Sequence, residues 1–526
     1  MRDLSIDAVA LLPALFPVVG LLVVLVADLV APRLSRAPWA LAATTALGVV
    51  VSALVGLLRG GEAATFCLAS TGGGAAVPVS CFWKVDALGG SLQLAAGLAA
   101  LVSIGLAWPR SATVPGQRDP GVVHVHEGPV AAQSAQAVLL LGALAGTVVV
   151  AASRDIGTLL VALELATLPV IVLVALSGRR GAVAGAVQLL VTSVVSFALL
   201  VLGLAVWFAA TGSPFLDPDA ALLSTGANGA GGAPAPVTTG LLSLAVVLVL
   251  AGIGFKLSLV PFHAWTPTTY AGTSTAVATF LATVSKIAAL AALLVVVRAV
   301  AVLGTPALLA IAVLAGLSMT VGNVMALRQD DVVRLLAWST VAQAGWVVLP
   351  LVSLSALGAR ASATYLLTYV TATLVAFAVV ALTVAEHPRG GRRLTAYDGM
   401  WRRHPVRAGA LALALTSLAG LPPGVIGLVG KVVALRPVVA QGWLWLAVVA
   451  AVNAVLGVAV YLRWLRPVVS LGDPETQPVA GTAPDAEPGV EPDRGRRRAV
   501  VAALVLSAAV LVVVSVQPDL LLGLLG

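Results

Sequence analysis

Apolar segments long enough to cross a lipid bilayer recur along the whole of this 526-residue chain. A transmembrane helix needs about 20 consecutive apolar residues, and lipid admits only helices or closed barrels because every backbone polar group must be paired. Charged residues make up 10% of the chain, against about 25% in soluble domains. The sequence therefore predicts an all-α polytopic membrane protein with fourteen transmembrane helices. The expected spans are residues 8–30, 38–58, 87–108, 134–152, 156–176, 183–210, 240–260, 275–299, 305–327, 332–353, 362–385, 408–432, 440–467 and 499–523.

The basic residues are divided unequally between two alternate sets of connecting loops. The richer set comprises Arg33, Arg36, Arg110, Arg118, Arg179, Arg180, Arg328, Arg334, Arg389, Arg392, Arg393, Arg402, Arg403, Arg407, Arg494, Arg496, Arg497 and Arg498. The poorer set comprises Arg59, Lys84, Arg154, Arg298, Arg360 and Arg436. Because basic loops stay on the cytoplasmic side, we expect the richer set in the cytoplasm and both termini outside. This bias explains the net charge of +8 without a nucleic-acid partner, and the first span is long enough to be a retained helix.

The loops carry few residues that suggest chemistry of their own. Cys67 and Cys81 share the loop 59–86, where they form either a disulfide or two unpaired thiols. His124, His126 and Glu127 lie in the loop 109–130 with no fourth ligand nearby, which is more typical of a solvated loop than of a metal site. The chain has no phosphate-binding loop, dinucleotide fingerprint or cluster-binding cysteine set, so we expect no nucleotide, flavin or iron–sulfur centre of its own.

Residues 252–290 contain the least expected combination in the chain, two lysines beside a proline-broken helix. Lys256 and Lys286 each lie in an apolar run, and Pro261 interrupts the chain between them. A lysine near the bilayer centre costs roughly 2.5–3.5 kcal/mol, and broken helices in transporters mark ion sites because freed backbone groups line a cavity. The pattern predicts a buried charge-relay site, with snorkelling of the lysines to an interface as the alternative.

Further ionisable residues extend this pattern. Glu164 lies in the apolar run 156–176, either as a proton or ion site or as a contact between helices. Lys431 follows a second Gly/Pro break at residues 420–424. Two broken helices five spans apart, each with a lysine, suggest an internal repeat in which spans 4–8 and 9–13 are the halves. His263 lies just after Pro261 and is either a relay group, since imidazole titrates near neutral pH, or a histidine of the helix-breaking loop.

The segment FKLSLVPFHAWTPTTYAGTSTAVATFLATVSKIAAL, residues 255–290, resembles the signature of the antiporter-like membrane subunits of the proton-pumping NADH–quinone oxidoreductase, respiratory complex I. The resemblance extends to ELATLP (164–169), LLAWSTVAQAGW (335–346) and SLAGLPPGVIGLVGK (417–431), and covers roughly residues 130–435. Lysine rather than glutamate at position 431, and no room for a long lateral helix after the last span, favour the subunit N branch of the family.

The resemblance implies a fold and a set of site residues. The family has fourteen helices with two inverted five-helix repeats, and its helices 7 and 12 are broken. The proton relay implied for this chain consists of Glu164, Lys256, Lys286, Lys431 and His263. Two positions depart from the family pattern: Gln188 stands where helix 6 usually has lysine, and Gln343 where helix 10 often has histidine. The expected divisions are residues 1–130 (helices 1–3), 131–300 (first repeat), 301–468 (second repeat), 469–498 (flexible cytoplasmic loop) and 499–526 (final helix).

The function that the resemblance implies is that of a proton-translocating subunit without a redox centre. Electron transfer from NADH to quinone would take place elsewhere in the complex, with NADH, FMN, iron–sulfur clusters and quinone bound by other subunits. The expected partners are neighbouring membrane subunits and the lipid of a bacterial plasma membrane. The alternatives are a subunit of a related multisubunit cation/proton antiporter or membrane-bound hydrogenase, and a scaffold that retains the fold without pumping.

Overall fold

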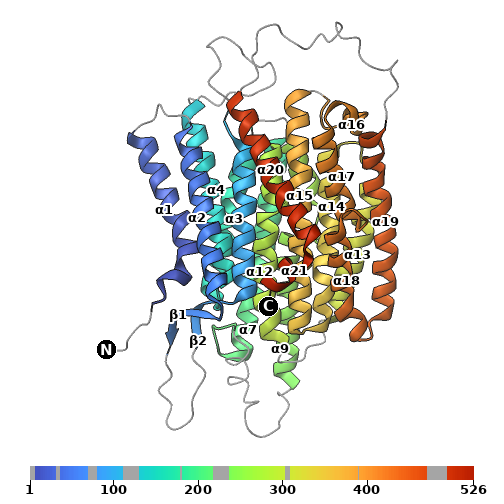
Figure 1. Cartoon of the computed structure of the whole chain (residues 1–526). Helices are drawn as coiled ribbons and strands as arrows, with labels where there is room; N and C mark the ends of the chain where they lie inside the picture. Colours follow the sequence, from blue (N-terminus) through green and yellow to red (C-terminus); the bar gives the residue numbers. More distant parts are fainter. Residues whose placement is uncertain are drawn as a thin grey trace.

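The structure, a computed structural model, describes residues 6–30, 36–68, 80–109, 129–177, 181–216, 236–301, 308–388, 390–470 and 494–525. Its helices pack side by side in one bundle with their axes roughly parallel (Figure 1). Within the described residues, 13 helical segments are long and apolar enough to cross a membrane. The prediction of an all-α polytopic membrane protein is therefore confirmed.

The elements follow one another in the order that the apolar runs predict. The first group comprises α1 (Ala8–Val30), α2 (Ala37–Arg59) and α3 (Ala87–Ala107). The next comprises α4 (Pro129–Ala152), α5 (Ile156–Leu165), α6 (Leu168–Ala175), α7 (Ala182–Thr211), α9 (Pro236–Leu257), α10 (Trp265–Gly272), α11 (Thr275–Ala282) and α12 (Val284–Ala301). The third comprises α13 (Leu308–Ala326), α14 (Val332–Val348), η1 (Leu349–Ser353), α15 (Ala356–Glu386), η2 (Leu394–Tyr397), α16 (Met400–Arg403), α17 (Pro405–Ala419), α18 (Val425–Ala440) and α19 (Leu444–Val469). The chain closes with α20 (Arg494–Val516) and α21 (Pro518–Leu524).

The predicted span 408–432 is present as two short helices, α17 and α18, and is therefore not among the 13 segments long enough to cross a membrane. α17 ends at Ala419, and α18 begins at Val425 and continues to Ala440, eight residues beyond the predicted limit of 432. The other predicted break, around Pro261, separates α9 from α10. Helices 7 and 12 are thus interrupted as expected, while the inverted repeat itself stays a prediction.

Two further interruptions have no counterpart in the prediction. The span 156–176 bends between α5 and α6, where Pro169 occupies the first turn of α6 and the Thr167 hydroxyl donates to the Leu163 carbonyl at 2.6 Å. Proline supplies no backbone N–H and so favours a new helix start at this point. The span 275–299 is interrupted at Thr283, whose φ of −124° and ψ of −75° are not helical.

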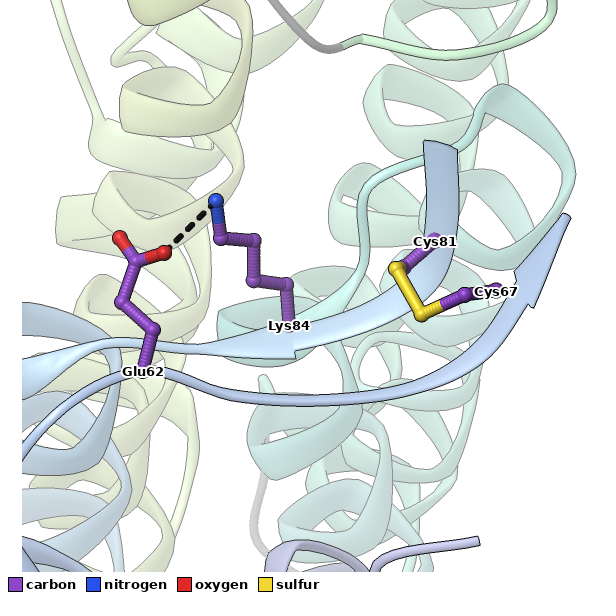
Figure 2. Close-up of a disulfide and its surroundings, with 4 residues drawn as sticks. All are labelled: Glu62, Cys67, Cys81 and Lys84. Carbon is purple, nitrogen blue, oxygen red and sulfur yellow. Dashed lines mark ion pairs between the residues drawn. A yellow bond between two sulfur atoms is a disulfide. The ribbon is translucent and has the colours of Figure 1, made fainter. Parts of the chain in front are cut away.

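The predicted loop 59–86 between α2 and α3 contains a pair of β-strands, which we call the hairpin. β1 (Ala63–Leu68) pairs antiparallel with β2 (Ser80–Val85), and a disulfide joins Cys67 to Cys81 (Figure 2). Trp83 Nε1 donates to the Ala10 carbonyl of α1 at 3.1 Å. Of the two alternatives for the cysteines, the structure has the bridged one, and the hairpin fastens one end of the bundle.

The two ends of the bundle differ in charge. The end opposite the hairpin, which we call the arginine-rich face, carries α16 and the starts of α17 and α20 (Figure 1). Its described basic residues include Arg36, Arg328, Arg334, Arg392, Arg393, Arg402, Arg403, Arg407, Arg494, Arg496, Arg497 and Arg498. α1 begins near the hairpin end of the bundle, and α21 lies toward the same end. Residues 124–127 and 471–493 lie outside the described residues, and α20 begins within the segment 469–498 that was predicted to be a loop.

Ion pairs near both ends hold the helices that carry the candidate site. On the hairpin side, Arg298 of α12 pairs with Asp86, the N-cap of α3, at 2.7 Å. Burial alone would raise the pKa of the Asp86 carboxyl, but Arg298 and the Gly89 backbone N–H outweigh it and hold that pKa below its usual range. On the arginine-rich side, Arg392 pairs with Asp331, the N-cap of α14, at 3.0 Å and donates to the Ala271 carbonyl of α10 at 2.9 Å.

Candidate functional site

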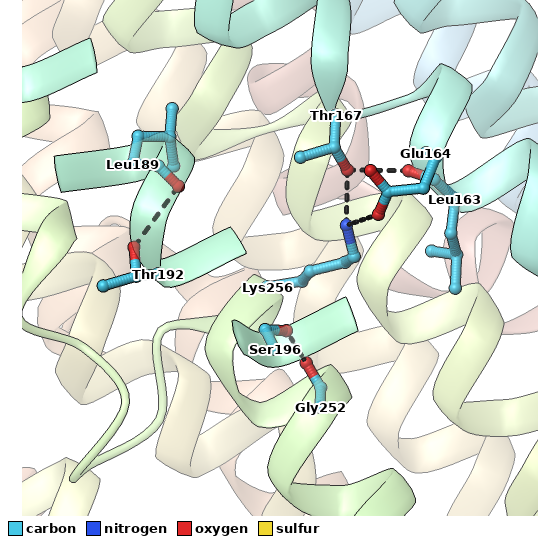
Figure 3. A network of polar contacts seen from close by, with 8 residues as sticks. All are labelled: Leu163, Glu164, Thr167, Leu189, Thr192, Ser196, Gly252 and Lys256. Atoms are coloured by element: carbon cyan, nitrogen blue, oxygen red, sulfur yellow. Dashed lines mark hydrogen bonds and ion pairs between the residues drawn. The ribbon is translucent and has the colours of Figure 1, made fainter. Parts of the chain in front are cut away.

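Glu164 and Lys256 form a buried pair between α5 and α9 (Figure 3). Lys256 Nζ lies 3.4 Å from Glu164 Oε1 and donates to the Thr167 hydroxyl at 2.5 Å. Both residues lie at helix ends, because Glu164 is one residue before the end of α5 and Lys256 is one before the end of α9. The carboxylate that the sequence marked as isolated therefore has a counter-charge, which offsets part of the cost of burying both groups.

Lys286 of α12 lies directly behind this pair but has no carboxylate partner among the described residues. Its Nζ donates to the Lys256 backbone carbonyl at 2.8 Å and to the Ser258 hydroxyl at 2.5 Å. It also lies 4.8 Å from the centre of the Trp265 ring. The break after α9 frees the Lys256 carbonyl from the helix. This buried carbonyl and the buried Lys286 ammonium group therefore satisfy each other. With 2% of its surface exposed, Lys286 is buried inside the bundle, an arrangement that does not favour the snorkelling alternative.

Lys431 of α18 repeats this environment in the second half. Its Nζ donates to the Ala419 carbonyl, which is the last of α17 and is freed by the break there. The same Nζ lies 5.5 Å from the centre of the Trp346 ring of α14. Each half therefore holds a buried lysine against a freed carbonyl and over an indole, at a distance where the ring attracts a cation.

His263 and Gln188 lie at the break between α9 and α10, away from the lysine ammonium groups. The His263 ring is half-buried and packs 5.3 Å from the Trp338 ring of α14. Gln188 Nε2 donates to the Ala264 carbonyl at 3.1 Å, and its Oε1 accepts from the Thr268 hydroxyl at 2.6 Å. Where the family usually has a lysine, this chain therefore has an amide that ties α7 to the broken helix.

A row of aromatic and hydroxyl side chains leads from Lys286 to α15, and most of it could not be predicted from the sequence. The Trp265 ring beneath Lys286 contacts the Tyr270 ring at 6.2 Å, and Tyr270 lies beside Thr340 of α14. Thr340 Oγ1 is 2.9 Å from the Tyr369 hydroxyl of α15. Buried tyrosines in apolar helices resemble ordinary core residues in a sequence, and only the meeting of α10, α14 and α15 brings these ones together.

A second group of polar residues lies in the second half around Gln343. The Gln343 amide bonds the hydroxyls of Tyr365 and Tyr461, and Tyr461 lies 2.6 Å from the Ser339 hydroxyl. Asn323 of α13, a polar residue in the middle of an apolar run, donates to Asn453 Oδ1 of α19 at 3.1 Å. Asn453 could have been found by the same criterion, a polar side chain in the middle of an apolar run.

Glu164 is also the charged residue of a surface groove. A cavity of about 610 Å³ is lined by Leu139, Leu160, Val161, Glu164, Leu165, Leu168, Pro169, Val172 and Phe197. These residues come from α4, α5, α6 and α7, and all except Glu164 are apolar. The Glu164 side chain is 18% exposed, so its carboxyl group lies between the buried Lys256 and the outer surface of the bundle.

The described residues hold no group of three His, Cys, Asp or Glu side chains that could bind a metal ion. The possible cluster of His124, His126 and Glu127 lies outside them. The chemistry that this arrangement can support is proton exchange along a row of buried amines, a carboxyl group and hydroxyls, since all of these groups can donate and accept protons in turn.

Residues 153–457, which contain the whole row, match the family described as NADH:quinone oxidoreductase/Mrp antiporter, TM. The chain is 40% identical to NADH-quinone oxidoreductase subunit N of Salinispora tropica, over 91% of this chain and 88% of that protein. It is 36% identical to NADH-quinone oxidoreductase subunit N 2 of Streptomyces griseus, over 98% and 93% of the two chains.

Solved structures show the same architecture. A chain of respiratory complex I from Thermus thermophilus superposes with a TM-score of 0.70 at 29% identity, covering 97% of this chain and 98% of that one. A chain of the Mrp complex from Dietzia sp. superposes with a TM-score of 0.76 at 22% identity, covering 99% and 96%. The second likeness concerns the fold alone.

Proposed function

Because the chain belongs to the family of NADH:quinone oxidoreductase/Mrp antiporter membrane subunits, in its subunit N branch, we propose that it translocates protons within an NADH–quinone oxidoreductase. The observation that carries the proposal is the contact between Glu164, Lys256 and Lys286. Lys256 binds the Glu164 carboxylate through its ammonium group and Lys286 through its backbone carbonyl. A change of charge at Glu164 thus reaches Lys286 through one residue.

The charges in this contact supply a mechanism by which protonation of Glu164 changes the protonation of Lys286. While Glu164 is ionised, it compensates the positive charge of Lys256. When Glu164 is protonated or turns away, that charge is no longer balanced, and it acts on Lys286 through a medium of low dielectric constant, where like charges repel strongly. Repulsion favours loss of a proton from Lys286, whose other described contacts are neutral. Restoring the pair allows Lys286 to take up a proton again.

Polar side chains lead away from Lys286 and form a path for a proton that it releases. The row of Tyr270, Thr340 and Tyr369 leads from the Trp265 ring under Lys286 toward α15, which packs against the helix of Lys431. Hydroxyl groups both donate and accept hydrogen bonds, and buried water can bridge gaps between them. Lys431 is the acceptor that we propose at the far end of this row.

The groove beside Glu164 is where a neighbouring subunit would act on the relay. Its apolar lining suits a transmembrane helix of a partner, and its carboxyl group would respond to a charge on that helix. We further propose that the arginine-rich face is cytoplasmic in a bacterial plasma membrane. NADH, FMN, iron–sulfur clusters and quinone would be bound by other subunits, and the electron transfer that drives the relay would occur there.

Glu164→Gln tests this function, because it keeps the shape of the side chain and removes its charge. We expect the complex to assemble with the variant chain, and proton translocation and the coupled NADH–quinone activity to fall at least fivefold. The measurement is acidification of inverted membrane vesicles together with NADH oxidation.

Glu386→Gln is the matched control, since Glu386 is a partly exposed carboxylate that pairs with Arg407 outside the relay. We expect it to pump normally. Normal pumping by a complex that contains Glu164→Gln would contradict an ionisable role for Glu164. It would favour the alternative in which this chain is a scaffold and other subunits of the complex pump.

A further inference from the structure

A chain of hydrogen-bonded side chains runs through the second half of the bundle toward Lys431. The Tyr461 hydroxyl lies 2.6 Å from the Ser339 hydroxyl and accepts a hydrogen bond of 2.8 Å from Gln343 Nε2. The Tyr365 hydroxyl donates to Gln343 Oε1. All four side chains are buried, so each polar group depends on its neighbour for hydrogen bonds that water would otherwise supply.

One end of this chain lies close to the arginine-rich face. Arg463, two residues after Tyr461 on α19, donates to the Leu327 and Gln329 carbonyls at 2.8 and 2.6 Å, in the loop between α13 and α14. Ser339 is seven residues after Val332, the first residue of α14, or about 10 Å along the helix. The pair of Tyr461 and Ser339 therefore lies about two helical turns below that loop.

The other end lies against Lys431. The Tyr365 and Trp346 rings stack with centroids 5.6 Å apart and planes at 20°, and Lys431 Nζ lies over the same Trp346 ring. One turn further along α15, Thr368 lies so close to α18 that a Cβ at Gly430 would be 3.3 Å from its hydroxyl. Tyr365 and Lys431 therefore contact the same indole, and the route requires water to link their polar groups.

The hydrogen-bond donors of the chain all point the same way. Tyr365 donates to the Gln343 carbonyl, the Gln343 amino group donates to Tyr461, and Tyr461 can then donate to Ser339. If the amide turned by 180°, its amino group would donate to Tyr365 and its carbonyl would accept from Tyr461. Because phenols and hydroxyls serve as donor or acceptor, each hydrogen bond between the four side chains can form in either arrangement.

We propose that Ser339, Tyr461, Gln343 and Tyr365 form an access route for protons between the arginine-rich face and Lys431, and that rotation of the Gln343 amide sets its direction. The proposal rests on the proton-carrying role given to Lys431 above. A histidine at this position could itself hold a proton, whereas an amide only orients its neighbours.

The transfer along the route conserves protons at each step. For uptake, Ser339 accepts a proton from a hydronium ion at the arginine-rich face, which leaves water, and gives its own proton to Tyr461. The phenolic proton of Tyr461 passes to a bridging water beside the amide. Tyr365 accepts a proton from that water and releases its own, through a second water, to a neutral Lys431 amine. Each oxygen gains one O–H bond as it loses another, and the net change is one proton moved to Nζ.

The first test measures whether water reaches Ser339, and the cysteine content of the chain makes a thiol-labelling experiment possible. The chain has two cysteines, both in the disulfide, so Ser339→Cys introduces the only free thiol. We expect a small, membrane-impermeant thiol reagent to label this variant at least tenfold faster in inverted vesicles than in intact cells, measured on the tagged chain after purification.

Ser103→Cys is the matched control, because Ser103 is equally buried and lies only four residues from the end of α3 on the arginine-rich side, but bonds the Ala99 carbonyl of its own helix. Equal labelling of the two variants, or faster labelling of Ser339→Cys from the hairpin side, would overturn the route. Labelling of Ser339→Cys does not require the complex to pump protons. Failure of the access route and failure of the proposed function can therefore be told apart.

Tyr461→Phe tests the proton step itself. Loss of the hydroxyl should lower proton translocation at least fivefold, while Tyr397→Phe, which removes another buried phenol packed against α19, should stay within twofold of the unsubstituted chain. Should Tyr461→Phe not assemble, Gln343→His should retain pumping and Gln343→Leu should lose it at least fivefold. Equal pumping by Tyr461→Phe and Tyr397→Phe, or by Gln343→His and Gln343→Leu, would overturn the proposal.

Discussion

Lys256 and Lys286 lie side by side but have different kinds of partner. Lys256 faces a carboxylate and a hydroxyl, whereas the described partners of Lys286 are two neutral oxygens and a ring. A charge-compensated amine is stabilised in its ionised form, while an uncompensated one in an apolar site changes protonation more easily. The geometry therefore favours Lys256 as the modulating group and Lys286 as the group that exchanges protons.

Thr167→Val tests how much the modulating group depends on its position. The substitution keeps the shape of the side chain but removes the hydroxyl that accepts from Lys256. A hydrogen bond to a charged group contributes about 1.5–3 kcal/mol, so we expect proton translocation to fall, though less than in Glu164→Gln.

Thr147→Val is the control, because Thr147 is buried in α4 and bonds only the Ala143 carbonyl of its own helix among the described contacts. Its pumping in inverted vesicles should be unchanged. If Thr167→Val pumped as well as Thr147→Val, Thr167 would have no part in positioning Lys256.

Charge was the property that made the site predictable from the sequence at this scale. Glu164, Lys286 and Lys431 stand out because ionisable groups inside apolar runs are rare. Tyr365, Tyr461 and Trp346 do not, since buried aromatic residues are common in any core. Their part in the site depends on which helices meet, and a single sequence does not contain that information.

At the scale of elements, the breaks bring the relay together. The ends of α5, α9 and α17 each place a charged group or a freed carbonyl beside another helix. The sequence predicted the breaks at residues 261 and 420–424, where proline and glycine are clustered. It did not predict the interruption at Thr283, because no residue there excludes a helix and only tertiary contacts impose the non-helical φ and ψ.

Gly427→Ala tests the packing of α18 across its break. A Cβ at Gly427 would overlap the Ser417 backbone carbonyl of α17, and overpacking of this kind typically costs about 1–3 kcal/mol. We expect a lower thermal unfolding midpoint of the purified complex and less assembled chain.

Gly409→Ala in α17 is the matched control, because a Cβ there meets no atom within 4 Å. Replacing glycine inside a helix usually stabilises it by about 0.5–1 kcal/mol. An unfolding midpoint for Gly427→Ala equal to or above that of Gly409→Ala would show that α18 is not packed against α17 in this way.

At the scale of the whole molecule, the disulfide and the arginines predict one orientation. The hairpin with Cys67 and Cys81 lies at the end opposite the arginine-rich face (Figure 1). A disulfide persists in an oxidising compartment, and arginines stay in the cytoplasm. We expect an impermeant thiol reagent to label both cysteines in intact cells after reduction.

A variant with serine at both positions should give no labelling and so controls for other subunits. Labelling confined to inverted vesicles would reverse the orientation of the chain. The hairpin was the main part of the fold that the sequence did not predict, since its two strands of six residues each are short and lie well apart in the sequence.

The central claim is that a proton passes through Lys286, and Lys286→Arg tests it most directly. Arginine keeps the positive charge but does not release its proton at physiological pH. The account predicts that the complex assembles and that proton translocation in reconstituted vesicles falls at least tenfold. Full translocation with arginine at this position would show that a fixed positive charge is sufficient, and it would contradict a relay through Lys286.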